Sequence, residues 1–186
     1  MQRNCKRLAF ISTSKTCWPV RQMKKVVIHS DGSCHSNPGP GGWAATLSYG
    51  QHTREISGGA LATTNNRMEL QAAIEALDAL KEPCEVEFFT DSEYLKNGVM
   101  DWLSSWRSNG WRTKAKQSVK NEDLWRALDN ATSRHKITWH WLKSHSGHQH
   151  NERCDQLANE AMAKIMRGLK AEQPNQSSQP REATMP

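Results

Sequence analysis

The sequence predicts an α/β domain built on a five-stranded mixed sheet. Short apolar runs bounded by turn residues indicate strands, and a longer segment with apolar residues on one helical face indicates a helix between them. Along the chain the predicted elements follow the order β-β-β-α-β-α-α-α-β-α. Strands that come first as a group and then alternate with helices imply an α/β domain with both antiparallel and parallel pairs.

Residues 1–22 form a basic extension ahead of the first strand. They contain five basic residues and no acidic residue, so most of the net charge of +6 lies there. The apolar run at residues 8–11 is too short for the core of a secretory signal. Three interpretations stay open, namely a segment without fixed structure, a weak transit peptide, and an upstream-start artefact before a true start at Met23. We favour the first and the last.

The segment from 24 to 61 is predicted to be β-structure. Residues 26–30 form an apolar run of the kind expected for a buried central strand. Residues 37–42 read Asn-Pro-Gly-Pro-Gly-Gly, which predicts a rigid loop. The runs at 43–49 and 53–61 surround a turn at Gly50 and are expected to pair as a hairpin.

Residues 65–80 are predicted to form a helix with one apolar stripe. The stripe consists of Leu70, Ala73, Ile74, Leu77 and Leu80. Thr64 or Asn65 can cap the start of this helix, because either side chain can accept from the free backbone N–H groups of its first turn. Pro83 lies just beyond its end.

The middle of the chain contains a strand and a region rich in Trp and Lys. Residues 85–90 form the strand, and residues 92–97 form a short helix that Gly98 is expected to stop. Residues 99–125 are predicted to be helical with a break at Asn109-Gly110. This region is the expected basic helical protrusion.

The last part of the chain is predicted to hold two helices around one strand. The helices cover residues 124–135 and 152–166, and the strand covers residues 137–142. Gly168 is expected to end the ordered domain, which then spans residues 23–167. Residues 168–186 are polar and are expected to be a disordered tail.

Composition narrows the classes of function. The chain has 186 residues, a mean hydropathy of −0.81 and a pI near 9.2, which suit a soluble protein with a polyanionic partner. Its apolar runs are far shorter than the ~18 residues needed to span a bilayer. Five cysteines without paired spacing argue against a disulfide framework and for a reducing compartment. Cys34 and Cys154 are interpreted as small buried residues.

Four carboxylates lie in four separate and distinctive segments. Asp31 and Asp91 each end an apolar run, Glu69 lies early in the helix between them, and Asp155 lies early in the last helix. A single acid of this kind is usually a cap or a surface charge. Strand ends and helix starts can bring distant side chains together, and clustered carboxylates repel unless cations neutralise them. The set therefore predicts a site for hard divalent cations and a metal-dependent nuclease.

The segments around these acids resemble those of the bacterial type 1 ribonucleases H, in order and over residues 24–166. The matching blocks are Ser30-Asp31-Gly32-Ser33-Cys34, Thr64-Asn65-Asn66-Arg67-Met68-Glu69-Leu70, Thr90-Asp91-Ser92, Val119-Lys120-Asn121-Glu122-Asp123-Leu124-Trp125, and His145-Ser146-Gly147-His148 leading into Asn151-Glu152-Arg153-Cys154-Asp155. The resemblance implies the ribonuclease H-like fold. It also implies endonucleolytic hydrolysis of the RNA strand of RNA–DNA hybrids, with 5′-phosphate and 3′-hydroxyl ends and little sequence specificity.

The same resemblance assigns roles at the site. Asp31, Glu69, Asp91 and Asp155 would ligate two Mg²⁺ ions, with Mn²⁺ as a substitute, and His145 would act as a proton shuttle or an aid to product release. By residue type, a zinc site formed by His145, His148, His150 and Cys154 is an alternative. We disfavour it because Cys154 is expected on the buried face of its helix.

Substrate contacts are predicted in two groups. By resemblance, Cys34, Asn37, Asn65 and Asn66 line the RNA strand, whose 2′-hydroxyls distinguish it from DNA. The second group would hold the DNA strand and consists of Trp102, Trp106, Lys114, Lys116 and Lys120. The tryptophans are also expected to pack the base of the protrusion.

The chain departs from the family pattern at a few positions. Glu93 stands where Gln is common, and Ser144 and Ser146 stand where Gly and Ala are frequent. Three rival functions remain: a DNA nuclease or recombinase of the same fold, an inactive hybrid-binding module, and the ribonuclease domain of a reverse transcriptase. We expect a monomeric, cytoplasmic enzyme that binds RNA–DNA hybrids and no membrane.

Overall fold

A computed structural model of the protein describes residues 23–143 and 147–172. Within them the chain forms five strands, five α-helices and one π-helical turn. Their bounds are β1 Lys24–Cys34, β2 Gly39–Tyr49, β3 His52–Thr63, α1 Asn65–Asp78, β4 Cys84–Thr90, α2 Glu93–Asn97, η1 Gly98–Trp102, α3 Leu103–Ser108, α4 Glu122–Ser133, β5 Lys136–Trp141 and α5 Gln149–Glu172. The predicted tail from residue 173 and the extension 1–22 lie outside the described residues.

The five strands form one mixed sheet in the order β3-β2-β1-β4-β5. The pairs β1–β2 and β2–β3 are antiparallel, whereas β1–β4 and β4–β5 are parallel. The predicted hairpin around Gly50 is present, since Tyr49 pairs with His52 across the turn. The sequence-based prediction of a five-stranded mixed sheet is therefore confirmed.

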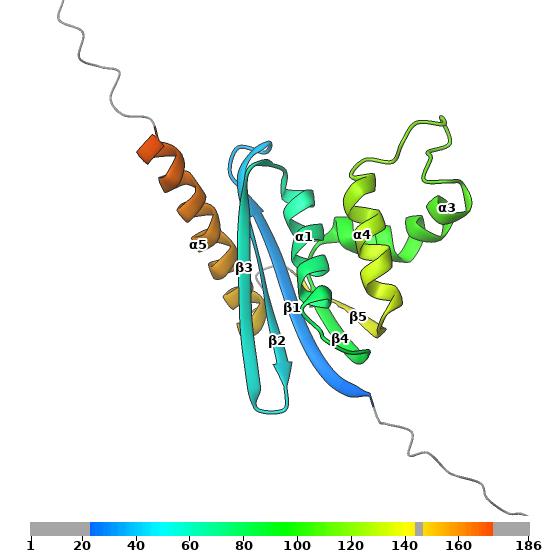
Figure 1. Ribbon diagram of the computed structural model, residues 1–186, viewed down its shortest axis with the longest axis horizontal. Coiled ribbons are helices and arrows are strands. Elements are labelled where there is room, and N and C mark those ends of the chain that lie inside the picture. The colour runs from blue at the N-terminus through cyan, green and yellow to red at the C-terminus, as the bar shows by residue number, and fades with distance from the viewer. Residues whose placement is uncertain (1–22, 144–146, 173–186) are drawn as a thin grey trace, which may run out of the picture.

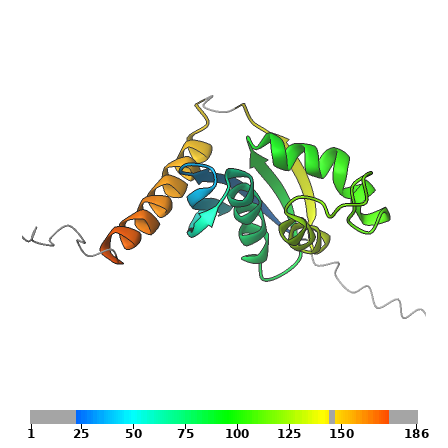
Figure 2. The same cartoon turned by 90° about the horizontal axis from the view of Figure 1, so that it is seen from above.

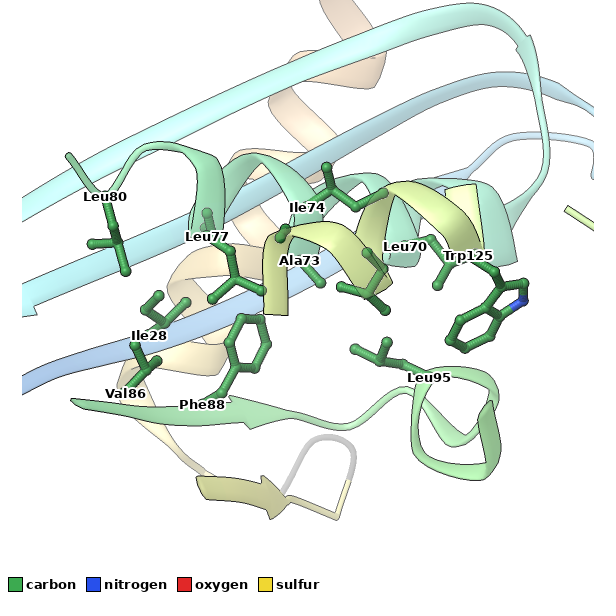
Figure 3. Close-up of a cluster of buried hydrophobic side chains, with 14 of the residues drawn as sticks. Ile28, Leu70, Ala73, Ile74, Leu77, Leu80, Val86, Phe88, Leu95 and Trp125 are labelled. Carbon is green, nitrogen blue, oxygen red and sulfur yellow. The ribbon is translucent and has the colours of Figure 1, made fainter. Parts of the chain in front are cut away.

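Helices cover both faces of the sheet, as Figures 1 and 2 show. Helix α1 packs against β1 and β2 on one face with α4 beside it, and α5 crosses the other face over β1, β2 and β3. The apolar stripe predicted for α1 is buried, from Leu70 to Leu80. It meets Ile28, Val86 and Phe88 of the two central strands in the main core (Figure 3). Burying such side chains is the main source of stability in a domain of this size.

Thr64 caps α1, since its hydroxyl accepts a hydrogen bond from the N–H of Arg67 at 3.4 Å. The short helix α2 ends at Asn97 with Gly98 as its C-cap, as predicted, but Gly98 does not break the helical path of the chain. Gly98 has helical dihedrals, and the chain continues through η1 into α3. Gly98 serves packing instead, because a Cβ there would lie 1.8 Å from the Trp125 ring.

Further boundaries differ from the prediction. Residues 39–42, predicted to belong to a rigid loop, begin strand β2, and α5 begins at Gln149 rather than at residue 152. Residues 109–121 are irregular, because Trp111, Lys116 and Asn121 have positive φ, which does not fit a right-handed helix. They form, with α3, a protrusion that stands away from the sheet beyond α4 (Figure 1). Helix α5 passes through Gly168 to Glu172, so the predicted end of order at Gly168 is wrong. One glycine costs a helix only about 1 kcal/mol, which good helix formers on either side outweigh.

None of the helices in the described part of the chain is both long enough and apolar enough to cross a membrane.

Candidate active site

The four predicted carboxylates line one cavity of about 420 Å³. They come from four elements: Asp31 from β1, Glu69 from α1, Asp91 from the residue after β4, and Asp155 from α5. Strands β1 and β4 are parallel neighbours, so the chain leaves both at the same edge of the sheet. This topology brings together acids that are up to 124 residues apart in the sequence (155 − 31).

Gly32 allows α1 to approach this edge closely. A Cβ at Gly32 would lie 2.3 Å from the backbone nitrogen of Glu69 and 2.5 Å from the carbonyl carbon of Met68. Those are rigid backbone atoms, so no other residue fits there without moving the helix. The Asp31-Gly32 pair thus supplies both a carboxylate and the space that lets Glu69 reach it.

Asp31 and Glu69 are buried, with only 8% and 6% of their surface exposed. Burial, followed by the negative charge of Asp91, raises the pKa of Asp31 to about 7. Burial and the charges of Asp31 and Asp91 raise the pKa of Glu69 well above its ordinary value. Two carboxylates held together away from water repel, and a cation between them would relieve that repulsion.

The two outer carboxylates are each held by an amide from α5. Asn151 donates from Nδ2 to Asp91 Oδ2 at 3.3 Å. Asn159 donates from Nδ2 to Asp155 Oδ1 at 2.9 Å, and its Oδ1 accepts from the Ser33 hydroxyl at 2.8 Å. Sequence reasoning missed both amides. The spacing of Asn159, one turn after Asp155, is the signal that could have found it.

The donor set fits a hard divalent cation. Carboxylate oxygens are the ligands that Mg²⁺ prefers. Oε2 of Glu69 is buried without a hydrogen-bond partner in the described structure, which is costly unless another group binds it. As the side chains stand, no three His, Cys, Asp or Glu residues of the described chain are gathered tightly enough to hold an ion. The metal site is therefore inferred from donor chemistry and charge.

The three described residues of the alternative zinc site, His148, His150 and Cys154, do not form a metal cluster. Cys154 is fully buried, its Sγ donates to the carbonyl of His29 at 3.3 Å, and burial raises its pKa to about 12, so its thiolate is disfavoured. His148 lines the carboxylate cavity, whereas His150 packs against the ring of His29. His145, with Ser144 and Ser146, lies outside the described residues.

The amides predicted to contact RNA lie at or near the cavity. Asn65 and Asn66 line it, and Asn65 donates from Nδ2 to Glu69 Oε1 at 3.4 Å. Asn37 lies beside the lining, where its Oδ1 accepts from the backbone N–H of Asn65 at 3.2 Å. Cys34 is half-buried rather than buried as predicted, because it lies at the end of β1. Glu93 and Glu152 are exposed and line the cavity, adding a fifth and a sixth carboxylate to its wall.

A second, more apolar cavity of about 450 Å³ lies at the base of the protrusion. Trp102, Trp106, Lys114 and Lys120 line it, whereas exposed Lys116 does not. The rings of Trp102 and Trp106 are 5.5 Å apart, and Trp106 also meets the buried ring of Trp125 at 5.4 Å, as predicted for packing residues. Lys114 and Lys120 thus line the same cavity as the aromatic base of the protrusion.

The comparisons with known proteins agree with this architecture. Residues 23–163 match the model of the family described as RNase H. The chain is 57% identical over 145 residues to a ribonuclease H of Mesorhizobium japonicum, covering 78% of this chain and 82% of that one. It is 55% identical over 140 residues to a ribonuclease H of Brucella anthropi, covering 75% and 91%. The crystal structure of LC9-RNase H1, a type 1 RNase H with the type 2 active-site motif, superposes with a TM-score of 0.71 at 30% identity, covering 77% of this chain and 74% of that one.

Proposed function

The chain belongs to the RNase H family, in its bacterial type 1 branch, and from this premise we propose that Asp31, Glu69, Asp91 and Asp155 are its catalytic carboxylates. The enzyme cleaves the RNA strand of RNA–DNA hybrids. The family depends on divalent metal ions, and we assign two Mg²⁺ ions to this site, with Mn²⁺ as a substitute. The observation that carries the assignment is the convergence of four acids from four elements on one cavity.

The chain's own side chains would divide the work among them. When bound, two divalent cations would lower the pKa of an attacking water and neutralise charge on the leaving 3′ oxygen. Asp31 and Glu69 would supply buried negative charge that holds the cations. The amides of Asn151 and Asn159 would keep Asp91 and Asp155 in place. Because a bond from phosphorus to the 3′ oxygen breaks, the products would carry 5′-phosphate and 3′-hydroxyl ends. His145 as proton shuttle remains a prediction.

We assign substrate recognition to residues that line or adjoin the carboxylate cavity and the cavity at the base of the protrusion. Asn65 and Asn66 face the carboxylate cavity, where their amides could hydrogen-bond 2′-hydroxyls, and Asn37 and Cys34 lie next to them. Trp102, Trp106, Lys114, Lys116 and Lys120 would hold the phosphates of the DNA strand. None of these groups reads base edges in a major groove, so we expect little sequence specificity.

One assay separates this proposal from the DNA nuclease and the hybrid-binding module. Labelled RNA–DNA, RNA–RNA and DNA–DNA duplexes of one sequence are incubated with Mg²⁺, with Mn²⁺ and with EDTA. We expect metal-dependent cutting of the hybrid's RNA strand alone. Cutting of DNA would favour the DNA nuclease, and hybrid binding without cutting would favour the binding module. A monomeric state and a cytoplasmic location remain predictions, which gel filtration with light scattering and cell fractionation would test.

A further inference from the structure

Tyr94 lies in the wall between the two cavities. It lines both the carboxylate cavity and the aromatic cavity of the protrusion. It belongs to the short helix α2, three residues after Asp91, so it is attached to the segment that carries a proposed catalytic acid. Its ring contacts those of Trp102 and Trp125, with centroids 5.8 and 5.4 Å away. Tyr94 therefore lines both the carboxylate cavity and the cavity that holds the proposed DNA contacts.

The hydroxyl of Tyr94 makes three hydrogen bonds to the corner at residues 120–125, where the protrusion joins α4. It accepts from Trp125 Nε1 at 3.0 Å and from Asn121 Nδ2 at 3.2 Å, and it donates to the carbonyl of Lys120 at 3.3 Å. A phenol has one donor and two acceptor positions, so this set uses its whole capacity. Trp125 is completely buried, so its indole N–H has no access to water as a replacement.

Arg67 makes a second connection to the same corner. It lies two residues before Glu69, in the first turn of α1. Its two terminal nitrogens donate to Asp123 Oδ1 and Oδ2 at 3.0 and 2.6 Å, which is a two-pronged pair, and Nη1 also reaches Asn121 Oδ1 at 3.4 Å. Asn121 thus receives a bond from α1 and gives one to α2.

Both connections meet at residues 120–125, where the irregular part of the protrusion joins α4. Asn121 has left-handed dihedrals, φ 58° and ψ 36°, so the chain turns sharply there. The side chain of Lys120, one of the proposed phosphate contacts, precedes this turn and is exposed. Side chains of α1 and α2 therefore bond this corner to the segments that carry Glu69 and Asp91.

We propose that Tyr94 and Arg67 are positioning residues that set the distance between the proposed phosphate contacts of the protrusion and the catalytic carboxylates. They would thereby set the phosphate at which the RNA strand is cut relative to the bound DNA strand. This inference rests on the proposed function. Neither side chain needs to touch the reacting atoms. Both act through the corner at residues 120–125, which would otherwise move with the protrusion.

The test uses Tyr94→Phe, which removes only the hydroxyl, and Arg67→Ala. Arg134→Ala is the matched control, because Arg134 also joins α4 to α1, through Asp78 at 2.9 Å, but at the ends of the helices far from the cavity. The substrate is a short hybrid with one fixed end and a labelled RNA strand. For Tyr94→Phe and for Arg67→Ala we expect KM to rise by about tenfold, the equivalent of one lost buried hydrogen bond. We expect kcat to change little and the cuts to spread to neighbouring phosphates.

Arg134→Ala should lower thermal stability while keeping the wild-type KM and cut positions. Arg67→Lys retains the charge but not the fork, so it should recover only part of the loss. If Tyr94→Phe and Arg67→Ala keep the wild-type cut positions and KM, or change only as Arg134→Ala does, the positioning role is overturned. Hybrid affinity measured by anisotropy in EDTA distinguishes a failure of the proposed function from a failure of the positioning role. Wild type that binds in EDTA but does not cut after Mg²⁺ is added would refute the proposed function, whereas equal affinity of wild type and both variants would refute the positioning role.

Discussion

Asn159 donates a hydrogen bond to Asp155 one helical turn earlier in α5, with Nδ2 and Oδ1 2.9 Å apart. The other end of the same amide accepts from the Ser33 hydroxyl, two residues beyond Asp31 in β1. This bridge ties the helix that carries the fourth acid to the strand that carries the first. It orients one oxygen of Asp155.

Replacing Asn159 by Ala should lower activity and metal affinity by about tenfold or more, as loss of a partner that orients a metal ligand usually does. Steady-state kinetics across a Mg²⁺ titration, together with calorimetric metal binding, would measure this. Gln156→Ala is the control, since Gln156 is exposed on the same helix and pairs with Glu160. Equal metal affinity in the two variants would contradict an orienting role.

Asp31→Asn should abolish cleavage and still fold. In the absence of divalent cations it should also be more stable than wild type at pH 8, because it removes a buried charge that repels Asp91. A gain of roughly 1–3 kcal/mol is the scale expected for relieving a buried like-charge contact. Denaturant unfolding in EDTA measures it. Retained cleavage would remove Asp31 from the catalytic set.

The stability difference between wild type and Asp31→Asn should depend on pH with a definite sign. The pKa of Asp31 rises on folding from 3.8 to about 7, so the folded state binds more protons than the unfolded state between these values. Its contribution is therefore present below pH 4 and is lost as the pH rises to about 7. His29, whose pKa burial lowers to about 4, acts in the opposite direction, and the difference between the two proteins largely cancels it. Unfolding curves at pH 4, 5.5 and 7 in EDTA would show a wild-type deficit that grows with pH. A constant deficit would contradict this prediction.

Neutralising Lys114, Lys116 and Lys120 together should weaken hybrid binding and flatten its dependence on salt. All three are exposed on the protrusion. Each lysine that contacts a phosphate contributes up to ~0.9 to the slope of log affinity against log salt on duplex DNA. Anisotropy titrations from low to physiological salt would measure the slope. An unchanged slope would leave these lysines as solvated surface groups.

Two helical glycines should respond oppositely to alanine. At Gly98 a Cβ would lie 1.8 Å from the buried Trp125 ring, so Gly98→Ala should destabilise the protein by about 1–3 kcal/mol. At Gly168 in α5 no atom outside its chain neighbours and its own helix backbone lies within 4 Å of the Cβ position, so Gly168→Ala should stabilise the helix by up to about 1 kcal/mol. Thermal unfolding of both variants compares them directly. A loss of stability at Gly168 would contradict the packing argument.

Local patterns in the sequence were enough to predict the helix and the strands that bury one face. The stripe from Leu70 to Leu80 repeats with a helical period, and the apolar runs at residues 26–30 and 85–90 indicate strands. The structure has a helix and two strands there, although β1 extends from Lys24 to Cys34. Glycine was less informative, because Gly98 reads as a helix stop but faces a Trp ring 27 residues later. No local rule distinguishes these two reasons for a glycine.

The sequence by itself indicated the fold class through the order of its predicted elements, the family through the resemblance of its motif blocks, and the four acidic segments through their local residue types. Only the tertiary structure decided which groups meet. It placed Asn159 between Ser33 and Asp155 and Tyr94 between two cavities, and it brought Arg67 to Asp123. The physical reason is that hydrogen bonds and burial act between groups that are close in space. Chain order constrains such pairs only through the packing of the whole domain.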